Sequence, residues 1–303
     1  MRFEESCEKD DWKPNQQNLA HLHGYLVTVC HVLGQNSEER EKMETYRSII
    51  GSPTTAAYAG HALGLANAYL ESGDMDTGRQ LMGRQNLPME KITRTPAEFA
   101  LLQAVEAKAE LFSGRYDDAI DRFSNIEKGL DTFQKLVFGC YLAEAYWRRG
   151  EFKPAEKRLK EIMDEAEKRA YRVLLPDIFQ RLTWLALDRD NHSIEEAGEW
   201  ENGRKNTCQK TDIPYVPDAF FLLSINQSSR AQQWAIDVRK TSSHHRNFDM
   251  EIRALLVIAD AWRREGNNEH ARRYLEDARI LMGKTNCRRE RNRLGKMEQL
   301  LKS

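Results

Sequence analysis

Apolar and small residues recur at helical spacing along most of this chain, and the pattern restarts after a glycine. Three segments carry it in nearly the same form, with an aliphatic residue, alanines and an aromatic residue ahead of the glycine: 65–73, 142–150 and 258–266. A small residue lies five positions after each glycine and a large apolar residue four positions later, as in Gly78 and Met82, Ala155 and Leu159, and Ala271 and Leu275. This spacing predicts two amphipathic helices joined by a tight turn, repeated along the chain.

A fourth copy, residues 107–114, keeps the glycine frame but lacks the aromatic residue, and Ala119 and Phe123 follow at the expected positions. Small residues at fixed places in both helices predict points where helices cross too closely for a larger side chain. These are Ala66, Ala143 and Ala259 on the first helices, and Ala119, Ala155 and Ala271 on the second.

The pattern resembles the tetratricopeptide repeat (TPR) family, which spaces small, aromatic and glycine residues in the same way within about 34 residues. The best matches are the units whose first helix ends at Gly73, Gly114, Gly150 or Gly266. Spacing places degenerate units at Gly34, at His192 and near Ser229. The resemblance implies an all-α fold: a right-handed α-solenoid of about seven antiparallel helix pairs, a TPR-like superhelix.

Local signals support these boundaries. Prolines precede apolar helical runs, as is typical of a first helical turn, at Pro53, Pro96, Pro176 and Pro217. Capping boxes are expected for Thr95 with Glu98 and for Ser193 with Glu196. One stretch, 198–217, breaks the rhythm and is followed by a short helix over 218–226. We interpret it as a bend in the superhelix, the alternative being a boundary between two halves.

Three parts are expected along the chain: an acidic N-terminal segment over 1–17, the TPR-like helical repeat array over 18–283 and a basic C-terminal capping helix over 284–303. Residues 1–50 contain six Lys/Arg and nine Asp/Glu, whereas 279–303 contain eight Lys/Arg and two Glu. The basic end is interpreted as a solvated helix that covers the last repeat, since repeat arrays need such caps. The alternative is a docking patch for an acidic partner or a polyanion.

Composition narrows the class of protein. The net charge of −1 excludes a globally basic nucleic-acid binder. No apolar run is long enough to span a membrane, and the first residues lack the apolar core of a secretory signal. Five scattered cysteines do not suggest a disulfide framework. We therefore expect a cytoplasmic protein that does not bind membranes.

In repeats of this family the first helices line a concave face, and positions two, three and six residues before each turn should point into it. They give the candidate peptide-binding groove: Asn67, Leu70, Lys108, Glu144, Trp147, Arg148, Arg189, Asp260, Arg263 and Arg264. A further row, ten positions before the turn, is mostly apolar: Leu63, Ala104, Cys140, Leu182 and Leu256. This row either completes the groove or packs between neighbouring helices.

The sequence thus predicts an interaction adaptor or scaffold whose groove binds a peptide or an amphipathic helix of another protein. The alternative is a ligand- or peptide-responsive regulatory sensor acting through another chain, which would need an enclosed pocket. The family's chaperone-tail clamp is not expected, because its basic positions are occupied here by Leu63, Val137 and Tyr141.

Other chemistry finds little support in the sequence. The histidines near the N-terminus lack the i, i+4 spacing of a helical zinc pair: His21, His23 and His31. No glycine loop suited to phosphate is present, so no enzyme activity, cofactor or metal is expected. Residues 147–149 and 262–264 both read Trp-Arg-Arg, which would suit stacking on bases, but acidic neighbours dilute the charge. Nucleic acid is therefore not an expected partner.

Overall fold

The structure is a computed structural model that describes residues 59–82, 96–126, 130–189, 193–211 and 218–302. These ranges contain helices and their connections and no β-strand, which confirms the all-α prediction for them. The expected first unit, with its turn at Gly34, and the acidic segment 1–17 lie outside the described residues.

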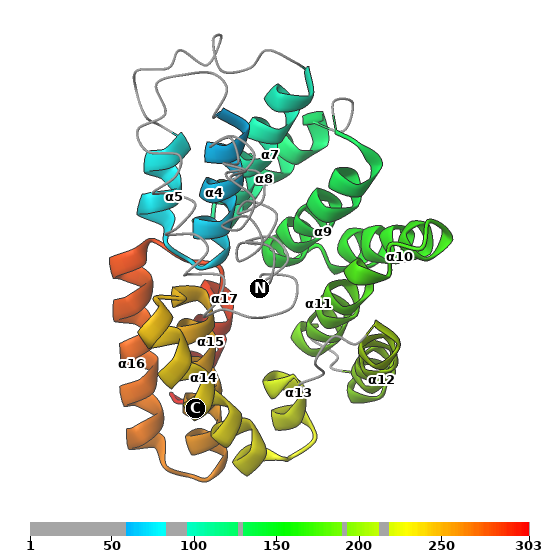
Figure 1. The fold of residues 1–303 in the computed structure, drawn as a ribbon. Coiled ribbons are helices and arrows are strands. Elements are labelled where there is room, and N and C mark those ends of the chain that lie inside the picture. Colours follow the sequence, from blue (N-terminus) through cyan, green and yellow to red (C-terminus); the bar gives the residue numbers. More distant parts are fainter. Residues whose placement is uncertain (1–58, 83–95, 127–129, 190–192, 212–217, 303) are drawn as a thin grey trace, which may run out of the picture.

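Helices follow one another as antiparallel pairs, and the two members of each pair pack together (Figure 1). The pairs are α4 (Ala59–Glu71) with α5 (Met75–Met82), α7 (Pro96–Phe112) with α8 (Tyr116–Ile126), α9 (Thr132–Arg149) with α10 (Phe152–Lys168), α11 (Leu175–Asp188) with α12 (Ile194–Thr211), α13 (Ala219–Ser224) with α14 (Ser228–His245), and α15 (Phe248–Arg264) with α16 (Asn268–Thr285). A 3₁₀ turn, η2 (Arg172–Leu174), precedes α11, and α17 (Arg291–Leu300) follows α16.

The glycine turns end the first helices in one common way. At Gly73, Gly114, Gly150 and Gly266 the angle φ lies between 77° and 97°, the left-handed region that glycine adopts without a steric cost. Each glycine N–H donates to the carbonyl three residues earlier, and the next N–H donates to the carbonyl five residues before itself. These bonds satisfy carbonyls that the helix end would otherwise leave free. The turn predicted near Ser229 has the same bonds but lies at Asn226, where φ is 58°.

Alanines predicted at helix crossings are fully buried. Ala66, Ala119, Ala143, Ala155, Ala259 and Ala271 all have no exposed surface. Gly78 holds the same position in α5, where an added Cβ would lie 2.8 Å from Cδ2 of Leu70. The close approach between helices explains why only small residues occur at these places.

Successive first helices contact one another from α4 through α7, α9, α11 and α13 to α15, and Figure 1 shows them arranged around a ring. The ring closes because α15 returns beside α4: the N–H of Asp249 donates to the carbonyl of Ser72 over 3.2 Å. Leu70 of α4 and Leu255 of α15 also belong to one buried hydrophobic cluster, together with Phe112 of α7. The first and last described pairs therefore share a core.

The stretch 198–217 differs from the prediction. Residues 198–211 continue α12, which begins after Ser193, whose hydroxyl accepts the N–H of Glu196 as an N-cap. The remaining residues, 212–217, lie outside the described ranges. The short helix after them is confirmed as α13, capped by the Asp218 carboxylate at the N–H of Phe221. The segment is mostly polar and buries few apolar side chains, such as Cys208, so its helical periodicity is weak.

Candidate binding site on the inner face

The predicted row six positions before the turn is brought together only in part. Lys108 and Glu144 are 1% exposed, and Lys108 Nζ donates to Asn67 Oδ1 over 2.9 Å. Lys108 also forms an ion pair with the Glu71 carboxylate of α4, which in turn accepts the hydroxyl of Tyr141. Polar side chains from α4, α7 and α9 therefore meet on the inner side of the ring.

Apolar members of the predicted groove belong instead to the core. Leu70 is fully buried in the largest cluster, and Trp147 packs with Trp184 and Leu185. The row ten positions before the turn is also buried, with exposures from 0% to 5%: Leu63, Ala104, Cys140, Leu182 and Leu256. This row packs between neighbouring helices, which settles the alternative left open by the sequence.

The remaining predicted residues lie apart from this centre. Arg189 pairs with Glu156 of α10 and with Glu196 of α12. Asp260 bonds to Arg263 and Arg264 one turn further along its own helix, α15. These four predicted groove residues, Arg189, Asp260, Arg263 and Arg264, thus engage local partners and do not join Lys108 and Glu144.

The centre is occupied by residues 286–293, which we call the C-terminal strap. It runs from the end of α16 into the first turn of α17: residues 286–288 are not helical, 289–290 form a turn, and 291–293 are helical. The guanidinium of Arg289 donates both Nε and Nη2 to the Glu144 carboxylate, each over 2.6 Å. The backbone N–H of Arg288 donates to the carbonyl of Phe112 over 2.7 Å. This differs from the expected solvated cap: the predicted boundary at residue 284 falls inside α16, and Arg289 and Arg293 are 5% and 7% exposed.

Glu290 and Arg293 extend the attachment. Arg148 Nη2 of α9 donates to Glu290 Oε1 over 3.0 Å, and Nε of Arg253 in α15 lies 3.3 Å from the same oxygen. Arg293 Nη2 donates to both oxygens of Asp188 at the end of α11, over 3.1 and 3.2 Å. Strap side chains therefore contact three first helices.

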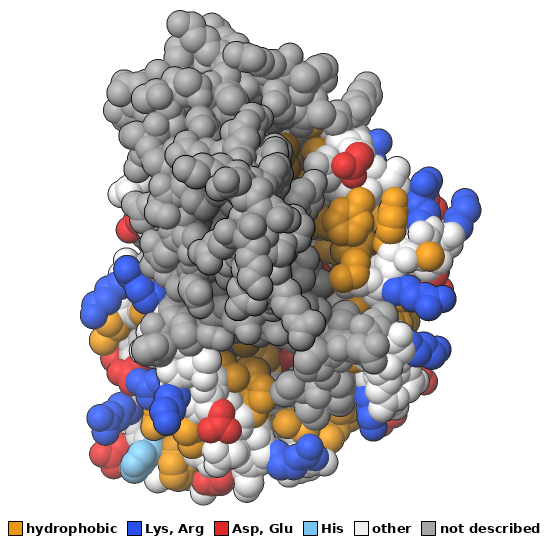
Figure 2. All heavy atoms as spheres, viewed as in Figure 1, with side chains coloured by type: hydrophobic (Ala, Val, Ile, Leu, Met, Phe, Trp, Pro, Cys, Tyr) orange, Lys and Arg blue, Asp and Glu red, His pale blue; other side chains and the backbone are white. Residues whose placement is uncertain are grey.

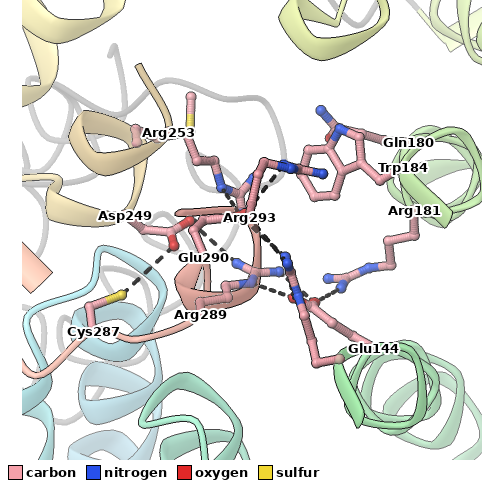
Figure 3. A network of polar contacts seen from close by, with 12 residues as sticks. Glu144, Gln180, Arg181, Trp184, Asp249, Arg253, Cys287, Arg289, Glu290 and Arg293 are labelled. Carbon is pink, nitrogen blue, oxygen red and sulfur yellow. Dashed lines mark hydrogen bonds and ion pairs between the residues drawn. The ribbon is translucent and has the colours of Figure 1, made fainter. Parts of the chain in front are cut away.

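Figure 3 shows these groups converging, with α9 and α11 on one side, α15 on the other and the strap between them. Arg181 of α11 also donates to Glu144, and Asp249 of α15 lies 3.4 Å from Arg289 Nη1. We refer to the set as the inner charge network: Glu144, Arg148, Arg181, Asp249, Arg253, Arg289, Glu290 and Arg293.

Burial and neighbouring charge set the protonation states. Burial disfavours a charged Glu144, but Arg289 and Arg181 outweigh it and hold the pKa of Glu144 well below its usual value. Glu290 is also buried, and Arg148 and Arg293 lower its pKa to about 2. Burial, reinforced by Arg289 and Arg181, lowers the pKa of Lys108 well below the usual range. Both carboxylates are therefore charged at neutral pH.

Aromatic rings flank the guanidinium groups. The Arg289 guanidinium lies 4.5 Å from the ring centre of Phe112, and that of Arg253 lies 4.5 Å from Trp184. The guanidinium of Arg293 lies 3.8 Å from the ring centre of Phe220. Such stacking favours arginine over lysine, whose compact ammonium group is more strongly hydrated.

Six of the eight residues of the inner charge network were missed by the sequence analysis, which named only Glu144 and Arg148, although a signal was present. Three apolar first helices each carry an acid followed four residues later by an arginine: Glu144 and Arg148, Asp177 and Arg181, Asp249 and Arg253. An i, i+4 pair on an apolar helix is a reason to suspect a buried polar site. No local pattern, however, links these pairs to Arg289, Glu290 and Arg293, which come from far along the chain.

Other chemistry is not evident in the described part of the chain. No group of three or more His, Cys, Asp or Glu there would hold a metal ion, and His21, His23 and His31 lie outside it. Helices long and apolar enough to cross a membrane are likewise missing from the described residues. Figure 2 shows basic and acidic side chains interspersed around the visible rim of the ring.

Comparison with known proteins does not identify a family. No family model matches this chain, and no curated protein matches it. What the inner face binds must therefore be argued from its own geometry.

Proposed function

We propose that this chain is a TPR-like helical repeat protein, a right-handed α-solenoid, that acts as an adaptor or scaffold and binds a peptide or helical segment of a partner protein in the concave groove lined by its first helices. Under this proposal the chain binds another protein, does not catalyse a reaction and acts in the cytoplasm. The identical turns at four glycines and the buried alanines support the TPR-like architecture.

One observation carries the binding proposal: side chains from successive first helices hold a segment of chain that is not part of any helix pair. Glu144 and Arg148 form hydrogen bonds and Arg253 forms an ion pair with strap residues that lie more than thirty positions away in the sequence. Repeat proteins recognise peptides in this manner, with side chains contributed by several units. These bonds are made by side chains of the strap, so binding of this kind depends on the amino-acid sequence of the bound segment.

Charge order defines the favoured ligand. Arg289 meets Glu144, Glu290 meets Arg148, and Arg293 meets Asp188. A segment with the order Arg-Glu-x-x-Arg places opposite charges against each of these groups. Like charges at any position would bring two buried groups of one sign together, which costs several kcal/mol at an interface.

The proposal is tested by measuring, by anisotropy, the binding of fluorescent 15-residue peptides to a variant with Arg289→Ala and Arg293→Ala, in which the strap no longer pairs with Glu144 and Asp188. One peptide set has the order Arg-Glu-x-x-Arg, and a matched set has the same composition with the order Glu-Arg-x-x-Glu. We expect the first set to bind at least ten times more tightly, and Asp188→Asn to reduce this preference because it removes the negative charge that faces the last arginine. A matched change at the exposed Asp117, Asp117→Asn, serves as the control. Equal binding of both sets, or no binding by either, would refute this function.

A further inference from the structure

The C-terminal strap and the proposed partner segment would use the same side chains. We propose that the strap is an internal ligand, which occupies the binding site until a partner segment with the same charge order displaces it. This inference rests on the proposed function and adds regulation to it: the protein binds its partner only when residues 286–293 leave the centre of the ring.

The strap is attached mainly through charged groups. Its buried side chains are Cys287, Arg289, Glu290 and Arg293, of which only Cys287 is apolar. Buried ion pairs contribute specificity more often than net stability, because desolvation offsets most of the attraction between the charges. A connection that served only to stabilise the ring would be expected to bury apolar side chains. The charge-rich contact is suited to exchange with a competitor of matching charge.

The ring does not depend on the strap for its helix packing. Each first helix packs against its own second helix and against the next first helix. Beyond the strap, α17 adds Leu294, Met297 and Leu301 to the shared cluster, while Leu300 remains 52% exposed. Displacement of the strap and α17 would therefore leave these contacts between helices in place, while uncovering Leu294, Met297 and Leu301.

The strap also leaves part of the inner charge network incompletely bonded. Within the described residues, Nε of Arg148 and both Nε and Nη2 of Arg253 have no hydrogen-bond partner, although all three atoms are buried. Arg253 lies 3.0 Å from Asp249 and 3.3 Å from Glu290, but its N–H groups are not aligned with their oxygens. A partner segment with a better placed carboxylate would satisfy these donors and bind more tightly than the strap.

The test uses a fluorescent synthetic peptide with the sequence of residues 284–303 and measures its binding to three full-length proteins. These are the parent, a strap variant with Arg289→Ala and Arg293→Ala, and a control variant with Arg288→Ala and Arg291→Ala. Arg288 and Arg291 are exposed, so the control removes the same charge from the same segment without touching the centre. The tethered strap acts at an effective concentration in the millimolar range, so it should exclude the peptide from the parent.

We expect the strap variant to bind the peptide at least tenfold more tightly than the parent, and the control variant to behave like the parent. A peptide that itself carries Arg289→Ala and Arg293→Ala should not bind to the strap variant. Equal affinity for parent and strap variant, or no binding to either, would overturn the inference. Equal affinity does not decide the proposed function, which is tested separately by comparing the two charge orders on the strap variant.

Hydrogen exchange on the parent gives a second measurement should the strap variant fold poorly. The Arg288 N–H is bonded to Phe112 in the centre of the ring. If the strap opens while the helices stay folded, this amide exchanges at least tenfold faster than helical amides such as that of Ala145, which has no exposed surface. Exchange of both amides at one common rate would mean that the strap leaves only on global unfolding, and would refute the inference.

Discussion

Replacement of Glu144 by glutamine tests whether the inner charge network is organised as the structure indicates. Glu144 is 1% exposed and lies between Arg289, Arg181 and Arg148. Glutamine has nearly the same shape, so packing changes little, but three guanidinium groups lose their shared negative partner. Removing one member of a buried ion pair typically costs about 3–5 kcal/mol, because the other charge stays desolvated without compensation. Such a loss is a large part of the 5–15 kcal/mol that stabilises an ordinary domain.

The pH dependence has a defined sign. The pKa of Glu144 is lowered in the folded state from its ordinary value near 4.5, so its stabilising contribution is fully present above about pH 4.5. That contribution is lost as the pH falls through the lower folded value. Glutamine does not titrate, so the difference in unfolding free energy between parent and variant should be largest near neutral pH. It should shrink progressively below pH 4.5.

The assay is urea denaturation followed by circular dichroism at pH 7 and pH 3. Glu265→Gln, at the exposed turn before α16, is the matched control and should change stability by less than about 0.5 kcal/mol. Adding Arg289→Met to Glu144→Gln should recover part of the loss, since it removes a charge left without a partner. A loss below about 1 kcal/mol at pH 7, or one that does not depend on pH, would refute the role assigned to this carboxylate.

Three further predictions concern the helix packing and a buried cysteine. Ala155→Leu should cost about 1–3 kcal/mol by overpacking a site with no exposed surface, and an unchanged thermal melt would contradict it. Gly150→Ala should lower the melting temperature, because φ at this residue is 97°, a conformation that alanine adopts only with strain. Gly283→Ala should raise the melting temperature slightly, because the site within α16 has room for a Cβ and alanine favours the helix. The same response at both sites would argue against the turn geometry. Burial raises the pKa of the Cys140 thiol to about 12, so this thiol should not react with iodoacetamide at pH 8 until the protein is unfolded; peptide mapping by mass spectrometry that finds it modified in the folded protein would contradict this.

The helix pairs were predictable because their causes are local. A glycine that ends a helix in the left-handed conformation acts through bonds to carbonyls three and five residues away, so the sequence around Gly150 contains what fixes the turn. Ala155 and Ala259 are likewise small because the helices on either side come close, and this recurs at a fixed distance from each turn. The helix over 198–211 was harder to predict, since its residues are mostly polar and give a weak periodic signal.

Only the tertiary structure decided what lies at the centre of the ring. The sequence identified Lys108, Glu144 and Arg148 as inward-facing, because their distance from the turn fixes their side of the helix. It gave no means of pairing Glu144 with Arg289, which lies 145 residues further along. That contact depends on the accumulated curvature of all the intervening helix pairs, which brings α15 back beside α4. The repeat is thus determined by local interactions. The closure of the ring and the position of the strap depend instead on the small rotations between successive helix pairs, which accumulate along the chain.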